Sequence, residues 1–141
     1  MNLYAESSAV LAWLLREPAA RAVRKILAAA EIVIASDLTL LECDRALIRL
    51  QKVGDVPETE VADMRSRLSA ASGRWNLLRI DPEIVERARR PFPGEPMRTL
   101  DALHLASALV ARSAVAGLTL LSLDHRIRGS GQGLGFEMLP R

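Results

Sequence analysis

The sequence predicts an α/β fold with a central, mainly parallel sheet of four to five strands covered by helices on both faces. The first observation is that short hydrophobic runs alternate along the chain with longer segments of helical character. The second is that residues suited to capping a helix follow these runs directly. In such sheets ligands bind beyond the carboxyl ends of the strands, so a site is expected among residues that follow strands.

The first strand is expected at residues 2–5, a short apolar run. Ser7 or Ser8 can cap the helix that continues over residues 9–15. Glu17-Pro18 is expected to open a second helix that runs to about residue 30, because proline is tolerated in a first helical turn.

The next strand is expected at residues 31–35, which are short and rich in β-branched side chains. Ser36 or Asp37 can cap a helix over residues 38–52. A glycine and a proline then mark the turn before another helix at residues 58–71.

The second half of the chain repeats this alternation. A strand is expected at residues 76–80, and Asp81-Pro82 starts a helix to about residue 90. A proline-rich loop over residues 91–96 leads to Thr99, which can cap a long apolar helix over residues 100–115. Further strands are expected at residues 118–122 and, as the last, 136–139.

The composition is that of a globular protein. The 141 residues, half of them hydrophobic, suffice for one domain over residues 1–141 with a buried core, and no linker or repeat divides the chain. The single cysteine, Cys43, excludes an internal disulfide and a cysteine-cluster zinc site. With no visible signal peptide and no apolar run long enough to cross a bilayer, we expect a cytoplasmic protein with no membrane contact.

The basic residues are almost all arginines, since only Lys25 and Lys52 are lysines. Arginine suits phosphate binding because its planar guanidinium can meet two oxygens at once. A compositional bias of the genome explains the same excess and is the preferred explanation, so composition alone says little about RNA.

Four acidic residues occupy unusual positions. Glu6 follows the first strand and Asp124 follows the strand at 118–122, so both are expected at the edge where α/β sheets bind ligands. Glu42 and Asp101 lie inside apolar helical segments, where a carboxylate is costly unless it is paired or binds a cation.

Taken singly, each acid is better explained as a cap or an ion pair. Glu42 can pair with Arg45 or Arg49 at helical spacing, and Asp101 lies in a first helical turn, where carboxylates are favoured. Taken together they indicate more. Two carboxylates about 5 Å apart repel by roughly 3 kcal/mol at an effective dielectric constant near 20, and a divalent cation removes that cost. Hard oxygen ligands favour Mg²⁺ or Mn²⁺ over zinc.

Four segments of the chain resemble the motifs of one known family, the PIN domains, and specifically the VapC toxins of bacterial type II toxin–antitoxin pairs. The segments are Leu3-Tyr4-Ala5-Glu6-Ser7-Ser8-Ala9-Val10, Ser36-Asp37-Leu38-Thr39-Leu40-Leu41-Glu42, Arg98-Thr99-Leu100-Asp101-Ala102-Leu103-His104-Leu105-Ala106 and Leu121-Ser122-Leu123-Asp124-His125-Arg126. The third is the most specific of the set. The likeness covers essentially the whole chain in order, spacing and length.

The resemblance implies a PIN-like three-layer α/β/α sandwich and a Mg²⁺-dependent endoribonuclease, with Mn²⁺ as a substitute. It implies that Glu6 and Asp101 hold the principal metal ion and that Glu42 and Asp124 contribute directly or through waters. Ser7 and Ser122 are expected to hydrogen-bond these carboxylates or a metal-bound water. The family usually has aspartate where this chain has Glu6, whose side chain is longer by about 1.5 Å, one carbon–carbon bond.

The same resemblance implies three partners: an RNA substrate, a homodimer mate and a cognate antitoxin. The antitoxin's tail is expected to cover the acidic crevice and to insert a basic side chain. Two other interpretations of the protein's function stay open. One is a catalytically weak PIN-like RNA-binding module in which Glu6 has spoiled the metal geometry. The other is an RNA-processing nuclease that has no antitoxin.

The sequence suggests roles for several further residues. Arg87, Arg89, Arg90 and Arg98 flank the proline-rich loop and either grip RNA phosphates or form a solvated face. His104 is expected to be structural rather than a general base or metal ligand.

Other features have an ordinary structural explanation. Cys43 is expected to be a packed thiol, because no histidine lies near it in the sequence. Trp13 is expected in the core or an interface. The glycine-rich segment 129–135 lacks the Lys-Ser/Thr pair of a phosphate loop and is expected to be a flexible turn. Arg65 and Arg67 are expected to be surface charge.

Overall fold

The computed structural model describes all residues from 1 to 141. The strands are β1 (Asn2–Ala5), β2 (Ile32–Ser36), β3 (Asn76–Leu78), β4 (Leu118–Leu121) and β5 (Met138–Leu139). The helices are α1 (Ser7–Leu14), α2 (Ala20–Ala29), α3 (Asp37–Val53), α4 (Glu58–Ser72), α5 (Pro82–Ala88), α6 (Thr99–Ala114) and α7 (His125–Gly133).

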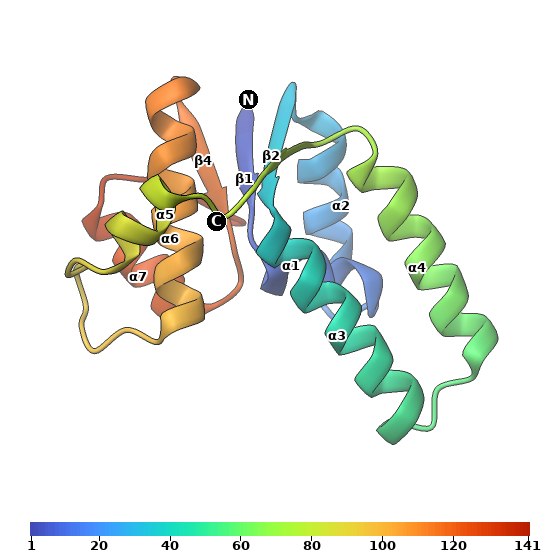
Figure 1. Ribbon diagram of the computed structural model, residues 1–141. Coiled ribbons are helices and arrows are strands. Elements are labelled where there is room, and N and C mark those ends of the chain that lie inside the picture. Colours follow the sequence, from blue (N-terminus) through green and yellow to red (C-terminus); the bar gives the residue numbers. More distant parts are fainter.

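The five strands form one sheet in the order β3-β2-β1-β4-β5, and every neighbouring pair is parallel. Leu3 of β1 lies between Val33 of β2 and Thr119 of β4. In Figure 1 the sheet separates α1 to α4 on one side from α5 to α7 on the other. The predicted fold class, a three-layer sandwich around a parallel sheet, is confirmed.

Two hydrophobic clusters fill the spaces between the sheet and its helices. Tyr4, Ile34 and Leu120 belong to the cluster under α5, α6 and α7, whereas Leu3 and Val33 belong to the cluster under α1 to α4. Successive residues of β1 therefore point to opposite faces, as the pleat of a strand requires. Both faces are apolar because helices cover both.

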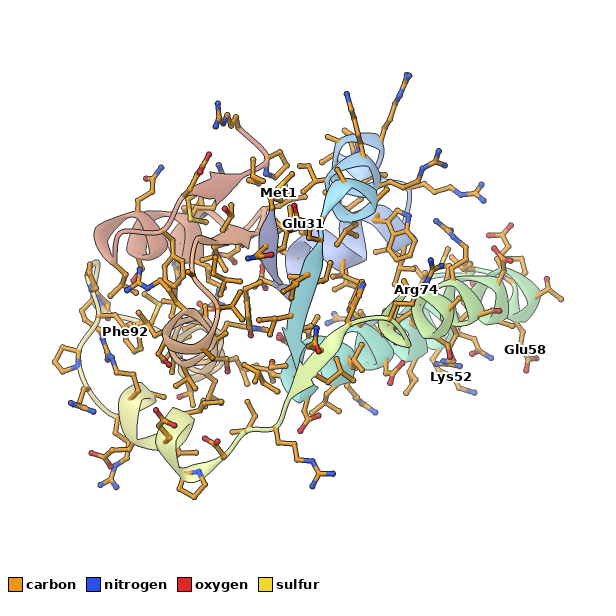
Figure 2. The ribbon with its side chains drawn as sticks, turned by 90° about the horizontal axis from the view of Figure 1, so that it is seen from above. Met1, Glu31, Lys52, Glu58, Arg74 and Phe92 are labelled. Atoms are coloured by element: carbon orange, nitrogen blue, oxygen red, sulfur yellow. The ribbon has the colours of Figure 1, made fainter.

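The helices α3 and α4 form an antiparallel hairpin that extends beyond the sheet. Figure 2 shows Lys52 and Glu58 at its far end, and Phe92 on the opposite side of the molecule. None of the helices is both long enough and apolar enough to cross a lipid bilayer.

Two predicted helix starts at the N-terminal end are wrong. The cap of α1 is neither Ser7 nor Ser8 but Glu6, whose carboxylate accepts a hydrogen bond from the Ser8 amide. The second helix begins at Ala20 and not at Glu17-Pro18. Arg16 has a left-handed backbone (φ 55°), and the Glu17 amide donates back to Ala12, so these residues still complete the end of α1.

Thr99 was expected to cap the long apolar helix, and this is wrong too. Thr99 is the first residue of α6, Arg98 occupies the capping position, and no side chain caps the helix there. The predicted cap Ser36 is confirmed, because its hydroxyl accepts from the Thr39 amide at 3.3 Å. The strands predicted at 76–80 and 136–139 are shorter, ending at Leu78 and beginning at Met138 respectively.

The glycine-rich segment predicted as a flexible turn is mostly helical, and α7 runs to Gly133. Asp124 caps this helix by accepting from the amides of Arg126 and Ile127. Gly131 packs so closely on the sheet that a Cβ there would lie 2.9 Å from Leu120 Cδ2. Gly131 thus serves the close packing of a helix on the sheet and not chain flexibility.

Candidate active site

The order of the strands places Glu6 and Asp124 next to each other. The chain passes from β1 outwards through β2 to β3 and then returns to place β4 on the other side of β1. Ligands of open parallel sheets bind at such a reversal, beyond the carboxyl ends of the two strands. Glu6 follows β1 and caps α1, and Asp124 lies three residues after β4 and caps α7.

The four acids singled out in the sequence line a single pocket of about 400 Å³. The remaining lining residues come from the start of α1 and from the start of α6: Ser7, Ser8, Leu11, Arg98, Thr99 and Leu100. Glu6, Glu42, Asp101 and Asp124 are far apart in the sequence, so only the packing of α1, α3, α6 and α7 on the sheet brings them together.

Glu6 is buried and held by serines. Its Oε2 accepts hydrogen bonds from the hydroxyls of Ser8 and Ser122, the latter at 2.7 Å. The Ser8 hydroxyl also accepts from the backbone amides of Leu123 (2.8 Å) and Asp124 (3.1 Å). Ser8 therefore ties the loop after β4 to the loop after β1, and it fixes the relative position of two of the four acids.

Glu42 is held from α1 and α6. Its Oε1 accepts from the Ser7 hydroxyl at 2.7 Å and lies 2.5 Å from Nε2 of His104. His104 is buried, and its Nδ1 lies 3.2 Å from the hydroxyl of Tyr4. Because an ionised carboxylate can only accept, Nε2 carries a proton and donates it to Glu42. Glu42 pairs with His104 and not with Arg45 or Arg49 at helical spacing.

Two opposing effects act on the acidity of Glu42. Burial raises its pKa, but the hydrogen bonds from His104 and Ser7 outweigh burial, and the pKa lies below the usual value for glutamate. Glu42 is therefore an ionised carboxylate at neutral pH. About a third of its side chain is exposed, and it lines the acidic pocket.

Asp101 is the least satisfied of the four acids. Its Oδ2 is buried without a hydrogen-bond partner, and Nε of the exposed Arg98 lies 3.5 Å away. A buried carboxylate oxygen without a partner costs free energy, which a cation can recover.

The residues in this pocket suit a hard divalent cation in their chemistry, since all four acids are oxygen donors. No group of three or more histidine, cysteine, aspartate or glutamate side chains is arranged so that it could hold a metal ion by itself. The pocket still fits Mg²⁺, because this ion commonly binds to only one or two carboxylates and completes its coordination shell with waters and substrate phosphates. Oδ2 of Asp101, which accepts no hydrogen bond and pairs only with Nε of Arg98, is one ligand oxygen that the structure leaves available.

Comparisons with known proteins show the family to which this chain belongs. The model of the PIN domain family matches residues 3–129. Ribonuclease VapC46 of Mycobacterium tuberculosis is 32% identical over 137 residues, which cover 97% of this chain and 95% of that protein. This chain is a PIN-domain protein of the VapC type. The resemblance seen in the motifs is thereby confirmed.

Solved structures support the fold of this PIN domain. FitAcB from Neisseria gonorrhoeae has a TM-score of 0.71 at 17% identity, covering 96% of this chain and 95% of that one. A toxin–antitoxin complex from Klebsiella pneumoniae has a TM-score of 0.63 at 18% identity, covering 95% and 92%. At these identities the likeness is one of fold.

The arginines around the proline-rich loop of the PIN domain differ in their contacts. Arg87 donates to the carbonyls of Arg90 and Pro91, and its guanidinium lies over the ring of Phe92 at 4.2 Å. Arg87 thus stabilises the loop. Arg89 is exposed and lies 3.8 Å from Glu86, and Arg90 is exposed without an ion pair.

Cys43 is buried in the core, and burial together with nearby carboxylates raises its pKa to about 12, so the packed-thiol prediction is confirmed. His104 is a buried, hydrogen-bonded histidine, as predicted, but it holds Glu42 directly. Arg65 is exposed, whereas the guanidinium of Arg67 lies 5.2 Å from the ring of Trp13.

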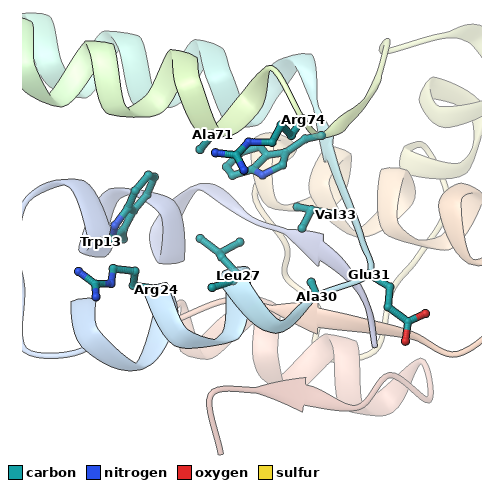
Figure 3. Close-up of a pocket in the computed structure, with 10 residues that line it drawn as sticks. Trp13, Arg24, Leu27, Ala30, Glu31, Val33, Ala71 and Arg74 are labelled. Carbon is teal, nitrogen blue, oxygen red and sulfur yellow. The ribbon is translucent and has the colours of Figure 1, made fainter.

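A second pocket of the PIN domain holds both tryptophans. Figure 3 shows Trp13 and Arg24 at one end and Glu31 at the other, with Leu27 between them and with Ala71 and Arg74 along the upper side. Trp75 also lines this pocket, which contains none of the four acids. Trp13 is half-buried: it packs against the cluster under α1 to α4 and lines this surface pocket, so it lies at the edge of the core.

Sequence reasoning missed Ser8 as a residue of the site. It considered Ser8 only as a helix cap, although its hydroxyl contacts Glu6 and two amides beyond β4. The available signal was its position two residues after an acid at a strand end, where a carboxylate that caps a helix can bond to it. The contact with the loop after β4 had no sequence signal.

Proposed function

We propose that this PIN domain is a Mg²⁺-dependent endoribonuclease and acts as the toxin of a VapBC-type toxin–antitoxin pair. The observation that carries the proposal is the pocket at the reversal of the strand order, lined by Glu6, Glu42, Asp101 and Asp124. The similarity to a protein named ribonuclease VapC46 over nearly the whole chain supports it.

In this proposal Asp101 and Glu6 hold the principal Mg²⁺, and Glu42 and Asp124 contribute directly or through waters. Bound Mg²⁺ would supply neutralisation of phosphate charge and a lower pKa for the attacking water. The protein's own part is to hold its carboxylates in place. Ser8 and Ser122 fix Glu6, and His104 donates to Glu42 and helps to keep it ionised.

The start of α1 accommodates the longer side chain of Glu6. Its carboxylate turns back to cap α1 at the Ser8 amide (3.1 Å) and is fixed by two hydroxyls. A carboxylate fixed in this way loses little further conformational freedom when it binds a cation. We therefore propose that Glu6 is a competent ligand.

The substrate in this proposal is RNA, bound through its phosphates by exposed arginines at the mouth of the pocket. Arg98 lines the pocket itself, and Arg89 and Arg90 lie at the end of α5, close in sequence to the loop that leads to it. The cut phosphate would then lie between arginine side chains and the acids.

Cleavage of a mixed structured RNA pool by the purified protein, free of any antitoxin, tests the nuclease proposal. Mg²⁺, Mn²⁺ and a chelator are compared, with Asp101→Asn as the test variant. Asp55→Asn is the control, because Asp55 is exposed in the α3–α4 turn. We expect cleavage that requires metal and Asp101 but not Asp55. RNA binding without cleavage under any metal would instead favour the weak RNA-binding module.

An antitoxin partner is part of the proposal. An acidic pocket attracts an arginine or lysine from a partner chain, and a protein of the same fold is known in a toxin–antitoxin complex. We expect a small upstream reading frame to encode a DNA-binding protein. That protein should co-purify with this chain and block cleavage. Absence of any such reading frame would favour an RNA-processing nuclease.

A homodimer is also proposed. Light scattering coupled to gel filtration should give twice the mass of one chain at micromolar concentration. A mass equal to one chain would contradict the proposed dimer but would leave the nuclease proposal intact.

A further inference from the structure

A pocket of about 550 Å³ lies beside the acidic pocket, between α5, the proline-rich loop and the start of α6. Its walls are mainly apolar, formed by Ile80, Val85, Ala88, Met97 and Leu103. Val85 is 43% exposed although it is a large apolar residue. The volume is within the range of small-molecule sites, so one nucleobase fits it.

The walls of this pocket are fixed by contacts within the loop. Arg87 bonds the carbonyls of Arg90 and Pro91, and Glu95 accepts from the amides of Phe92 (3.2 Å) and Met97 (3.0 Å). The pocket is therefore formed before any ligand binds, which lowers the entropic cost of binding.

The charge around the pocket favours an anionic ligand. Arg89 and Arg90 both line it, and Arg90 is exposed without an ion pair. Glu95 is the one acid in the lining, and both of its carboxylate oxygens already accept backbone amides. Apolar walls with arginines at the rim suit a nucleotide, because a guanidinium can bind a phosphate or stack on a base.

The apolar pocket adjoins the acidic pocket. Thr99 lines both, and Arg98, the preceding residue, lines the acidic pocket and lies 3.5 Å from Asp101. A strand of RNA with a phosphate at the acids can therefore place a neighbouring nucleotide in the apolar pocket.

We propose that this apolar pocket receives one unpaired base of the RNA substrate, next to the scissile phosphate, while Arg89 and Arg90 hold the adjoining phosphates. The inference rests on the proposed ribonuclease function and adds a base-binding subsite to it. An unpaired base is required because a base in a duplex cannot leave its stack to enter the pocket without cost.

The test compares two fluorescent ligands of equal charge, a random-sequence RNA octamer pool and an abasic ribose-phosphate octamer. Binding is measured by fluorescence anisotropy on the Asp101→Asn protein with Mg²⁺, so that nothing is cleaved. We expect the RNA pool to bind about tenfold or more tightly than the abasic chain, a typical effect of burying one base. Equal binding of the two ligands would overturn the proposal.

Variants then test whether the preference for RNA over the abasic chain depends on the apolar pocket. Val85→Glu should abolish the preference for bases, and Val53→Glu should keep it, since Val53 is 75% exposed at the far end of α3 and the charge change is the same. Val85→Ser, which adds no charge, is the second variant if Val85→Glu does not fold. A preference for bases that survives in folded Val85 variants would contradict the proposal.

Arg90→Gln should weaken both ligands alike and lower the slope of log affinity against log salt by about 0.7, the value for one phosphate contact on a single strand. Binding without cleavage and cleavage are separate readouts. A protein that prefers bases but never cleaves would refute the nuclease function alone, and a nuclease with no preference for bases would refute this subsite alone.

Discussion

Nε2 of His104 lies 2.5 Å from Oε1 of Glu42, and the hydroxyl of Tyr4 lies 3.2 Å from the other ring nitrogen. A side chain of the central strand is thus connected through a buried histidine to a carboxylate of the acidic pocket. The histidine serves two purposes in this arrangement. It satisfies two polar groups in and next to the core, and it fixes the direction of Glu42.

We expect His104→Leu to lower the free energy of unfolding by about 2–4 kcal/mol, since Tyr4 and Glu42 lose a buried partner. His104→Gln can still donate to Glu42 and should lose about half as much. Urea unfolding followed by circular dichroism measures both. An unchanged urea midpoint for His104→Leu would show that the contact with Glu42 does not stabilise the fold.

Two glycines of α7 provide a matched pair for the packing of that helix. A Cβ at Gly131 would lie 2.9 Å from Leu120 Cδ2 and 3.0 Å from Met138 Sδ, whereas nothing lies within 4 Å of one at Gly129. Gly129→Ala should stabilise the protein by about 0.5–1 kcal/mol through helix propensity. Gly131→Ala should be less stable than Gly129→Ala by about 1–3 kcal/mol because of overpacking. Equal urea midpoints would contradict the close contact.

The thiol of Cys43 should react very slowly in the folded protein. Burial, and then the charges of Glu42, Asp44 and Glu6, raise its pKa to about 12. With an ordinary thiol pKa of about 8.5 after unfolding, the thiolate fraction at pH 8 should differ by about three orders of magnitude. Iodoacetamide labelling followed by mass spectrometry, with and without denaturant, measures this.

The sign of the corresponding pH effect follows from the direction of the shift. The folded state favours the neutral thiol, so its stability should begin to fall as the pH rises above the unfolded pKa of about 8.5. Cys43→Ser should lack this part of the alkaline loss. Rapid labelling of the folded protein at pH 8 would show that Cys43 is accessible and its thiolate is not disfavoured.

Metal binding should be visible without any RNA. If the dissociation constant for Mg²⁺ is about 1 mM, 10 mM Mg²⁺ should raise the melting temperature by about 5 °C in a chain of this size. Asp101→Asn should reduce this shift to about 1 °C or less. The control Asp55→Asn should retain it. The same shift in all three proteins would indicate that Mg²⁺ binds elsewhere.

Local sequence patterns determined the succession of strands and helices in this protein. The hydrophobic runs at 2–5, 31–35 and 118–122 became three adjacent parallel strands, because apolar segments of that length bury best between helices. The same patterns placed Glu6 and Asp124 after strands. These are short-range properties, which depend on residues a few positions apart.

The sequence was less informative wherever a local rule competed with packing. The segment 129–135 contains enough glycine to predict a turn, but the cap at Asp124 and the contact of Gly131 with the sheet favour a helix. Local propensity is a weak indicator that tertiary contacts override.

Only the tertiary structure decided which side chains hold the acids. Ser8 contacts the loop after β4 because β1 and β4 are neighbours, and His104 meets Glu42 because α6 and α3 flank the same end of the sheet. These pairs lie 62 to 115 residues apart in the chain. No local pattern encodes such contacts, since they exist only once the order of the strands has brought the ends of different elements to one edge.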